Sequence, residues 1–567
     1  MSALRTWARR GWTRTAQLAP RRTDWHGSPG RDLTAGLTVA MVALPLALGF
    51  GVSSGMGARA GLVTAVVAGA VAAALGGSRV QVSGPTGAMT VVLVPIIAQH
   101  GPDGVLVVGL LAGLMLVALG YAGAGRFIAY VPVAVVEGFT AGIAVIIALQ
   151  QVPAALGVRS RAEKVLPATV DAARDWLHDP AWAPLGMAAV VTLAVLLLAR
   201  LRPELPGALV AIALATLANH GPGLDAATIG HLPSGLPVPS FPTTGWASAG
   251  DLLLPAVAVA ALAALESLLS ARVADAMTVG SRHDPDRELA GQGVANLVVP
   301  LFGGVPATAA IARTAVNVRA GASSRLAALT HALVLLVAVL VAGPLVARIP
   351  LAALAGVLIA TAVRMVRVSS LAALARATRG DAAVLLVTAG ATVVLDLVTA
   401  VLIGLVLAGF FALRQVAATA RLEETPLDDE GSHADEERRL LDEHIVAYRL
   451  DGPLFFAAAH DFLLELTEVS RVRVVVLRMS RVTTIDATGA VLLGDTISRI
   501  EARGITVLIS GVRPQHLQVL QELGIHDRLA HERHLFEHTP DAIAHARQHA
   551  ARVHHDPGTP VDPERSS

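Results

Sequence analysis

The sequence predicts an α-helical polytopic membrane protein that ends in a soluble α/β unit. Of its 567 residues, 54% are hydrophobic and 15% are charged, and the mean hydropathy is +0.61. A soluble chain of this length carries more charge and fewer apolar residues. Long apolar spans fill the chain up to Arg414, whereas strand and helix patterns alternate after residue 444. This change of pattern separates a membrane part from a soluble part.

The composition excludes several function classes. Cysteine is absent, which removes disulfides and thiolate metal or redox chemistry. The net charge of +1 provides no field that would attract nucleic acid. The only lysine, Lys164, follows a glutamate, so no phosphate-binding P-loop occurs and ATP-driven pumping is not expected. No constellation of catalytic residues indicates an enzyme.

About fourteen apolar spans lie between Asp32 and Arg414. They centre near residues 42, 68, 91, 112, 138, 191, 212, 260, 295, 313, 334, 357, 387 and 404. The spans near residues 91, 295 and 313 are too short for a full crossing at a rise of ~1.5 Å per residue. Irregular backbone at membrane depth is tolerated where it lines a cavity, so these short spans direct attention to a site inside the membrane.

Arginine placement orients the spans. With a cytoplasmic N-terminus, even-numbered spans should end inside, where arginine and lysine are enriched. Most arginine groups fall at such ends, whereas Arg348 and the group from Arg159 to Lys164 do not. Residues 1–31 are basic and lack an apolar core, so they predict a surface segment or a flexible tail rather than a signal peptide. We therefore expect a multi-pass protein whose N-terminus and C-terminal unit are cytoplasmic.

Two breaks interrupt the apolar spans, one at Ser83-Gly84-Pro85-Thr86-Gly87 and one at Gly303-Gly304-Val305-Pro306. Proline suits the first turn of a helix, so Thr308 and Arg313 are expected in the first turns of a new helix after Pro306. A half-helix that starts inside the membrane presents free N–H groups and a positive dipole end to an anion. Paired breaks point to the binding site of an inverted-repeat transporter, although each alone could be an ordinary kink.

Glu266 is a second indication of a site, because it lies in the apolar segment from Leu252 to Ser270. An ionised carboxylate in hydrocarbon costs several kcal/mol, so such acids face a cavity, a partner or an ion. Glu137 could be a similar acid or a helix-end residue near the cytoplasmic face. Asp396 is predicted to cap a helix. His283 is expected to have a structural role, and His331 to be a buried histidine with satisfied hydrogen bonds.

These motifs resemble the SulP family of sulfate-permease-like anion transporters. The resemblance rests on both breaks, on Glu266-Ser267-Leu268-Leu269, and on Gln292-Gly293-Val294-Ala295-Asn296. The first helix and the Pro-Thr-Gly motif are most similar to the cyanobacterial sodium–bicarbonate symporter branch. The resemblance implies two seven-helix inverted repeats, in which the third and tenth helices are half-helices that meet head to head. It also implies a homodimer surrounded by lipid in a bacterial inner (plasma) membrane.

The resemblance further implies a site for a small inorganic anion and a coupling cation. Arg313 would bias the field, and the backbone at both half-helix starts would hold the anion, namely at Thr86, Gly87, Ala88, Ala309, Ala310 and Ile311. Glu266 and Ser270, with the backbone at Ala309, would bind sodium. Ile311 stands where the symporter has a threonine, which weakens the case for sodium. Proton coupling through Glu266 is the alternative, since a carboxylate removed from water takes up a proton more readily. No other cofactor is expected.

The resemblance leaves the substrate and the transport mode open. Bicarbonate, sulfate and C4-dicarboxylates all suit a site lined by N–H groups. Alternating access coupled to a cation is the preferred mode, and an uncoupled channel or exchanger on the same fold is the alternative. A membrane-anchored regulator would not explain an acid such as Glu266 inside the membrane.

The soluble part is predicted from strands at 445–450, 472–477 and 506–510 with helical patterns between them. The motif Ile485-Asp486-Ala487-Thr488-Gly489 resembles a STAS domain, in which the place of Thr488 is a phosphorylation site in soluble relatives. Asp486 and Thr488 could instead cap the next helix. The predicted parts are residues 1–31 (basic segment), 32–416 (transport domain), 417–443 (charged linker), 444–540 (STAS) and 541–567 (histidine-rich tail).

The histidines after residue 526 are irregularly spaced, and no acids or cysteines are arranged with them. This pattern favours a solvated helix followed by a disordered end over a metal site. The histidines concerned are His531, His534, His538, His545, His549, His554 and His555.

Overall fold

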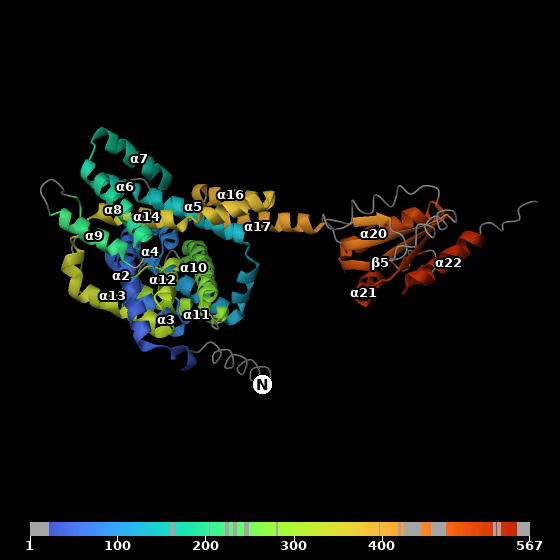
Figure 1. Cartoon of the computed structure of the whole chain (residues 1–567), viewed down its shortest axis with the longest axis horizontal. Helices are drawn as coiled ribbons and strands as arrows, with labels where there is room; N and C mark the ends of the chain where they lie inside the picture. The colour runs from blue at the N-terminus through green and yellow to red at the C-terminus, as the bar shows by residue number, and fades with distance from the viewer. Residues whose placement is uncertain are drawn as a thin grey trace, which may run out of the picture. The chain divides into compact units, whose positions relative to one another are not determined.

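The computed structural model describes residues 22–158, 165–202, 205–220, 226–230, 235–242, 249–278, 282–395, 397–417, 421–424, 444–454, 472–525, 529 and 534–552. The chain forms two compact units, Met1–Ala408 and Gly409–Ser567. The first unit is helical and the second contains a β-sheet (Figure 1). Each unit is described below by itself.

The helical unit begins with a short 3₁₀ helix, and two very short strands interrupt its α-helices. Its elements are η1 (Arg22–Trp25), α2 (Pro29–Ser53), α3 (Ala58–Leu75), β1 (Ser83–Gly84), α4 (Gly87–Ala122), η2 (Ala124–Tyr130), α5 (Val133–Gln150), α6 (Val152–Leu156), α7 (Val165–His178), α8 (Trp182–Leu201), α9 (Gly207–Ala218), α10 (Ala249–Met277), α11 (Pro285–Val298), η4 (Val299–Phe302), β2 (Thr308–Ala309), α12 (Ile311–Arg319), α13 (Arg325–Val346), α14 (Leu351–Met365), α15 (Val368–Ala377), α16 (Arg379–Val394) and α17 (Leu397–Ala417).

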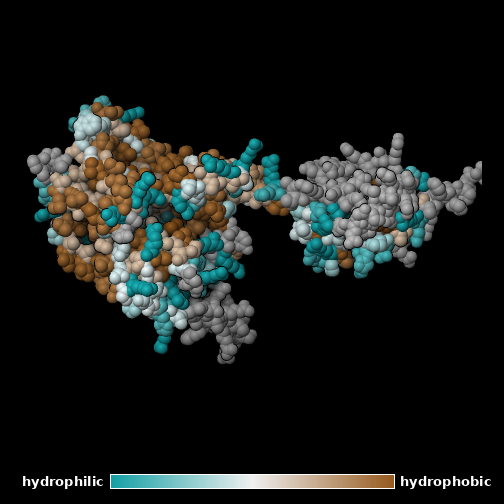
Figure 2. All heavy atoms as spheres, in the orientation of Figure 1, coloured by the Kyte–Doolittle hydropathy of each residue, from teal (hydrophilic) through white to brown (hydrophobic). Residues whose placement is uncertain are grey.

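The outer surface of this unit is apolar. Nine helices in the described part of the chain are long and apolar enough to cross a membrane. Large apolar side chains point outward, for example Leu254 and Val341, each 76% exposed. Figure 2 shows apolar residues over much of the visible surface of this unit. Water would disfavour such a surface and hydrocarbon would not, as expected for a membrane protein.

Each of the fourteen predicted span centres falls within a helix. The centres near 91 and 112 share α4, which bends at Gly101, where φ is 67° and ψ is −175°. Glycine adopts this left-handed backbone without the steric cost that a Cβ brings. The segment before the bend is therefore a half-helix that begins at Gly87. That all fourteen spans cross the membrane, in two inverted repeats, stays a prediction.

The second unit is a five-stranded sheet with helices on both faces. Its elements are β3 (Arg421–Glu424), β4 (Ile445–Leu454), β5 (Val474–Ile485), α20 (Ala487–Glu501), β6 (Thr506–Ser510), α21 (Pro514–Glu522), β7 (Leu535–Phe536) and α22 (Thr539–Arg552). The strand order is β3-β4-β5-β6-β7, with β3 antiparallel to β4 and the other neighbours parallel. The three predicted strands are present, and part of the predicted linker forms the edge strand β3.

The alternation of side chains along β5 explains the two layers of helices. Val475 and Leu477 belong to a core that includes residues of α20 and α21. Val474 and Val476 belong to a second core with Ala542 and Ala546 of α22. Successive side chains of a strand point to opposite faces, so α22 covers the face that α20 and α21 leave open.

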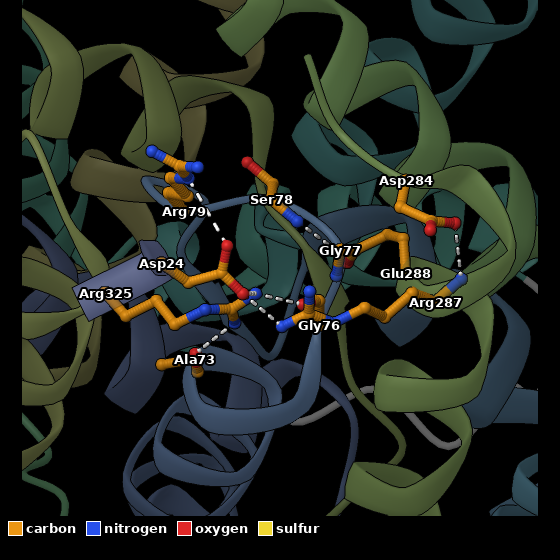
Figure 3. A network of polar contacts seen from close by, with 10 residues as sticks. All are labelled: Asp24, Ala73, Gly76, Gly77, Ser78, Arg79, Asp284, Arg287, Glu288 and Arg325. Atoms are coloured by element: carbon orange, nitrogen blue, oxygen red, sulfur yellow. Dashed lines mark hydrogen bonds and ion pairs between the residues drawn. The ribbon is translucent and has the colours of Figure 1, made fainter. Parts of the chain in front are cut away.

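The N-terminal segment contributes a buried acid to the helical unit. Asp24 of η1 is 5% exposed. Its Oδ2 accepts from Arg287 at 2.5 Å and Arg325 at 3.3 Å, and Arg79 lies 3.4 Å from Oδ1 (Figure 3). Arg325 also donates to the carbonyl oxygens of Ala73 and Gly76. Asp24 thus anchors Arg22–Trp25 to the helices, whereas residues 1–21 of the predicted basic segment lie outside the described residues.

Candidate functional site

The two sequence breaks meet in the middle of the helical unit. Ser83 pairs with Ala309 and Gly84 with Thr308 in an antiparallel two-stranded ladder formed by β1 and β2. The helix α4 begins three residues after the end of β1, at Gly87, and α12 begins two residues after the end of β2, at Ile311. Because the strands are antiparallel, the two helices start near one another and leave the ladder in opposite directions. Thr308 lies on β2, so its predicted place in the first turn of the second half-helix is wrong.

Polar side chains of α3 and α11 hold this crossing in place. Asn296 brackets Ala307, whose N–H donates to Oδ1 at 2.8 Å and whose carbonyl accepts from Nδ2 at 2.9 Å. Gln292 donates to Ser83 Oγ at 2.6 Å. Thr64 Oγ1 accepts from the N–H of Val305 and donates to its carbonyl oxygen. The motif from Gln292 to Asn296 therefore positions both breaks at once.

Glu266 of α10 lies where the two breaks meet. Its Oε2 accepts a hydrogen bond from Thr308 Oγ1 at 2.5 Å and another from Thr86 Oγ1 at 2.8 Å. Thr86 is the N-cap of α4, and its Oγ1 also accepts from the N–H of Met89. One carboxylate oxygen of Glu266 thus links Thr86, which precedes α4, to Thr308, which lies shortly before α12. The residue is partly exposed.

Backbone hydrogen bonds show which N–H groups at the second break are engaged. The N–H of Ala309 donates to Ser267 Oγ at 3.2 Å, and that of Ala310 donates to the carbonyl oxygen of Val82 at 3.0 Å. The first N–H groups of a helix have no acceptor within the helix. The groups left to meet an anion at α12 therefore begin at Ile311, the last of the three residues predicted at this break.

Arg313 brings a buried positive charge to the same place. Its side chain is 1% exposed, and Nη2 donates to the carbonyl oxygen of Pro85 at 2.7 Å. Nη1 has no hydrogen-bond partner in the described part of the chain. Gly84 has a φ of 154°, which residues with a Cβ rarely adopt, and a Cβ here would lie 2.6 Å from Nη1, so the position favours glycine. The guanidinium connects the two breaks and interacts electrostatically with Glu266.

The predicted cation residues are not joined in one hydrogen-bond network. Ser270 lies one helical turn after Glu266, but its Oγ donates to Thr314 Oγ1 at 3.0 Å. Thr314 Oγ1 also accepts from the N–H of Val82. The hydroxyls that contact Glu266 are those of Thr86 and Thr308. The oxygens gathered around the carboxylate therefore differ from the predicted sodium ligands.

The two half-helix starts differ in exposure. Thr86 is 7% exposed and Ala88 is 1% exposed, and a Cβ on Gly87 would collide with Ile147 of α5. Ile311 is 38% exposed. The described structure therefore leaves the start of α12 accessible, whereas protein atoms cover the start of α4.

Other predicted residues lie away from this crossing. Glu137 is buried near the start of α5 and forms an ion pair with Arg367. His283 bonds through Nδ1 and its backbone N–H to Asp275, as expected for a structural residue. His331 is fully buried in α13, and neither ring nitrogen has a hydrogen-bond partner among the described residues, in contrast to the prediction. Asp396 lies outside the described residues.

In the soluble unit, Asp486 is the N-cap of α20 and accepts from the N–H of Gly489 at 2.7 Å. Thr488 is exposed in the first turn of this helix. An exposed hydroxyl at a helix N-terminus is accessible to a kinase, and a phosphate there would meet the positive end of the dipole. Phosphorylation of Thr488 stays a prediction.

Two comparisons with known sequences identify the family. Residues 30–388 match the model of the sulfate permease family, and residues 441–542 match that of the STAS domain. The chain belongs to the sulfate permease family. Putative sulfate transporter YvdB of Bacillus subtilis is 35% identical over 90% of this chain and 96% of its own length. Bicarbonate transporter BicA of Synechocystis is 31% identical over 91% of this chain and 94% of its own length.

Solved structures support the same assignment. The transmembrane domain of a cyanobacterial bicarbonate transporter, BicA, is 31% identical, has a TM-score of 0.60, and covers 67% of this chain and 97% of its own. The murine Slc26a9 anion transporter in its inward-facing state has a TM-score of 0.79 and covers 91% of each chain. It is 18% identical, so it shows the fold alone. The chain is thus an anion transporter of this family with a C-terminal STAS domain, rather than an enzyme.

Proposed function

We propose that this protein is a secondary active transporter of small inorganic anions of the sulfate or bicarbonate class. Its N-terminus and STAS unit would lie in the cytoplasm of a bacterium, and its helical unit in the inner membrane. The observation that carries the proposal is the position of Glu266, whose Oε2 accepts from Thr86 and Thr308 between two half-helix starts. Two positive helix ends and Arg313 surround this point, which favours negative charge there.

Glu266 couples the anion to a cation because the carboxylate is itself an anion at the positive site. A substrate anion near an ionised Glu266 meets repulsion of a few kcal/mol at short range. A proton or a sodium ion on the carboxylate removes this repulsion, and the neutral site then accepts the anion. Neutralisation also lowers the cost of moving charge across the membrane field. Anion and cation therefore bind together, which is the requirement for symport.

The residues present fit a sodium ion in part. Sodium is a hard cation that prefers oxygen ligands, and the hydroxyls of Thr86 and Thr308 lie 2.8 Å and 2.5 Å from the carboxylate oxygen. They would hold the ion together with Glu266. A proton needs only the carboxylate and the hydroxyl acceptors beside it. Uptake driven by a sodium gradient or by a proton gradient distinguishes the two coupling ions.

The substitution Glu266→Gln tests the proposal in proteoliposomes. Glutamine keeps the shape of the side chain but cannot be ionised. We expect uptake of labelled sulfate or bicarbonate to lose its dependence on an imposed sodium or proton gradient, while anion binding persists. The matched control is Glu137→Gln, whose ion pair with Arg367 lies away from the crossing. A Glu266→Gln protein with the wild-type rate and gradient dependence would falsify the coupling role.

Alternating access is the transport mode we favour over a channel. The start of α12 is more exposed than the start of α4, where Ile147 lies against Gly87, and this asymmetry between the half-helix starts supports a site that is open to one side at a time. A channel would need both sides open at once. Electrical recordings from planar bilayers distinguish the modes, since a channel gives resolved unitary currents and a transporter does not.

A further inference from the structure

Three histidines of the soluble unit come together in space although they are separated in sequence. His534 directly precedes β7, whereas His545 and His549 lie on α22. The imidazole nitrogens that could bind a metal lie within 4.8 Å of one another. His534 is 3% exposed, and the other two are half-buried. The rings are 5.7, 5.2 and 4.9 Å apart between centroids.

The arrangement follows from the fold. Residues four apart on a helix lie on one face, so His545 and His549 project side by side. Ala542 and Ala546 of α22 are fully buried against β4, β5 and β6, which fixes the rotation of the helix. Phe536 of β7 contacts the His545 ring, with centroids 5.3 Å apart. His534, next to the edge strand β7, therefore lies beside the face of α22 that carries His545 and His549.

We propose that His534, His545 and His549 form a binding site for a zinc-class divalent cation. Imidazole is a preferred ligand of zinc, copper and nickel, and three histidines with one open position are an established zinc arrangement. Zinc–nitrogen bonds of ~2.0–2.1 Å place tetrahedral ligand atoms about 3.3 Å apart. The nitrogens already lie within 4.8 Å of one another, so a bound ion would have to draw them closer by about 1.5 Å at most.

The proposal departs from the expectation drawn from the sequence, which favoured a solvated helix over a metal site. Irregular histidine spacing gave no reason to expect a metal site, because His534 approaches only through the pairing of β7 with β6. The spacing His545-x₃-His549 is the one feature of the sequence that could have predicted a metal site here, since histidines separated by three residues recur as zinc ligands. His538, also in this region, is exposed and is not a member of the cluster.

A bound ion would connect the last described helix to the edge of the sheet. β7 has only two residues, Leu535 and Phe536, so few backbone hydrogen bonds hold this edge. A metal that bridges His534 to α22 adds a cross-link to the apolar contacts that already join this edge of the sheet to the helix. Metal binding to the folded form stabilises it by mass action. We therefore expect zinc to protect residues 534–552 from local opening.

The test uses the full-length chain, purified in detergent without a histidine tag and freed of metal with a chelator. Zinc chloride is titrated in competition with a chromophoric chelator. We expect one tight zinc ion per chain. His545→Ala and His549→Ala should each weaken binding by at least ~10-fold, a loss that follows even removal of an outer-shell partner. His538→Ala is the matched control and should bind zinc as the wild type does.

Two measurements on the wild-type chain remove any dependence on how the variants fold. Cobalt(II) should give the visible absorption of a tetrahedral or five-coordinate ion, and zinc should slow hydrogen exchange in peptides from residues 534–552. Rings that merely pack against one another would give no tight zinc, no cobalt spectrum and no protection. That result, or equal loss of affinity in His538→Ala, would overturn the proposal.

Discussion

Thr308 Oγ1 donates to Glu266 Oε2 across 2.5 Å, which joins the strand before α12 to the acid of α10. A hydroxyl has one proton to donate, so this bond fixes the direction of the Thr308 side chain. Thr86 donates to the same oxygen from the other break. Any movement of one half-helix relative to the other therefore changes the surroundings of the Glu266 carboxylate.

We predict that Thr308→Val lowers gradient-driven anion uptake by about tenfold or more, because a hydrogen bond to a charged group contributes roughly 1.5–3 kcal/mol. Valine keeps the volume and branching of threonine but cannot donate. Thr308→Ser keeps the hydroxyl and should retain most of the activity. Initial uptake rates in proteoliposomes, normalised to the amount of folded protein, provide the measurement. Equal rates in the valine and serine variants would contradict the role of this bond.

The sequence predicted the helices well because apolarity alone determines where a span lies. It failed at the crossing, where β1 and β2 have two residues each and so carry no periodicity. Pro306 has the features of a helix start, yet the chain first passes through β2. The N-cap of α12 is Ala310, which makes no side-chain cap, so no sequence signal marked the true start.

Long-range partners were the other limit of sequence analysis. Ser267 and Thr314 contact the breaks through hydroxyls that nothing in the sequence distinguishes from other buried hydroxyls. Asp24 is the one acid in residues 1–31, which contain seven arginines. This basic composition gave no indication that Asp24 pairs with buried arginines of the helices. In each case the partner lies far along the chain, and only the packing of helices brings the two together.

The Asp24 contacts predict a large effect on stability. Arg287 and Arg325 are 3% and 0% exposed and share Asp24 as an acceptor. Asp24→Asn leaves both guanidinium groups without this countercharge, and breaking a buried pair in this way costs about 3–5 kcal/mol. We expect a lower midpoint of thermal aggregation in detergent, measured by size-exclusion chromatography after heating.

Arg79→Gln is the matched control for Asp24→Asn. The Arg79 side chain is 37% exposed and lies 3.4 Å from Asp24, so its loss should cost about 1 kcal/mol or less. If both variants have the same midpoint of thermal aggregation as the wild type, the contacts shown in Figure 3 do not stabilise the helical unit.

The pairing of β3 with β4 determines where the chain can be divided. Truncation after Ala417 should leave a helical unit that is monodisperse in detergent, because both units have their own cores. Truncation near residue 425 would carry β3 away from its sheet and leave an unpaired strand. We expect a single size-exclusion peak for the shorter form and aggregation for the longer one. The reverse order would show that β3 belongs with the helices.

His516 makes the soluble unit sensitive to acid. Burial lowers the pKa of this imidazole, and the nearby Arg513 lowers it further, while a backbone hydrogen bond at Thr483 opposes both. The folded state thus binds fewer protons than the unfolded state, so stability is complete above the unfolded pKa of about 6.5 and falls as the pH drops below it. Pulse proteolysis in urea at pH 7.5 and 5.5 measures the change. His516→Gln should reduce this pH dependence, and an unchanged profile would exclude His516 as its source.

Ile311 offers a way to distinguish sodium from proton coupling. It is the first residue of α12, is 38% exposed, and stands where the sodium–bicarbonate symporter that the sequence resembles has a threonine. Ile311→Thr keeps the branched side chain and adds an oxygen at the accessible half-helix start. If sodium is the coupling ion, we expect its half-saturating concentration for anion uptake to fall, because a hard cation gains a ligand. Ile311→Val, which has the same branching without the hydroxyl, should leave that concentration unchanged. Uptake that ignores sodium in the wild type and in both variants, yet follows an imposed pH gradient, would identify the proton as the ion that neutralises Glu266.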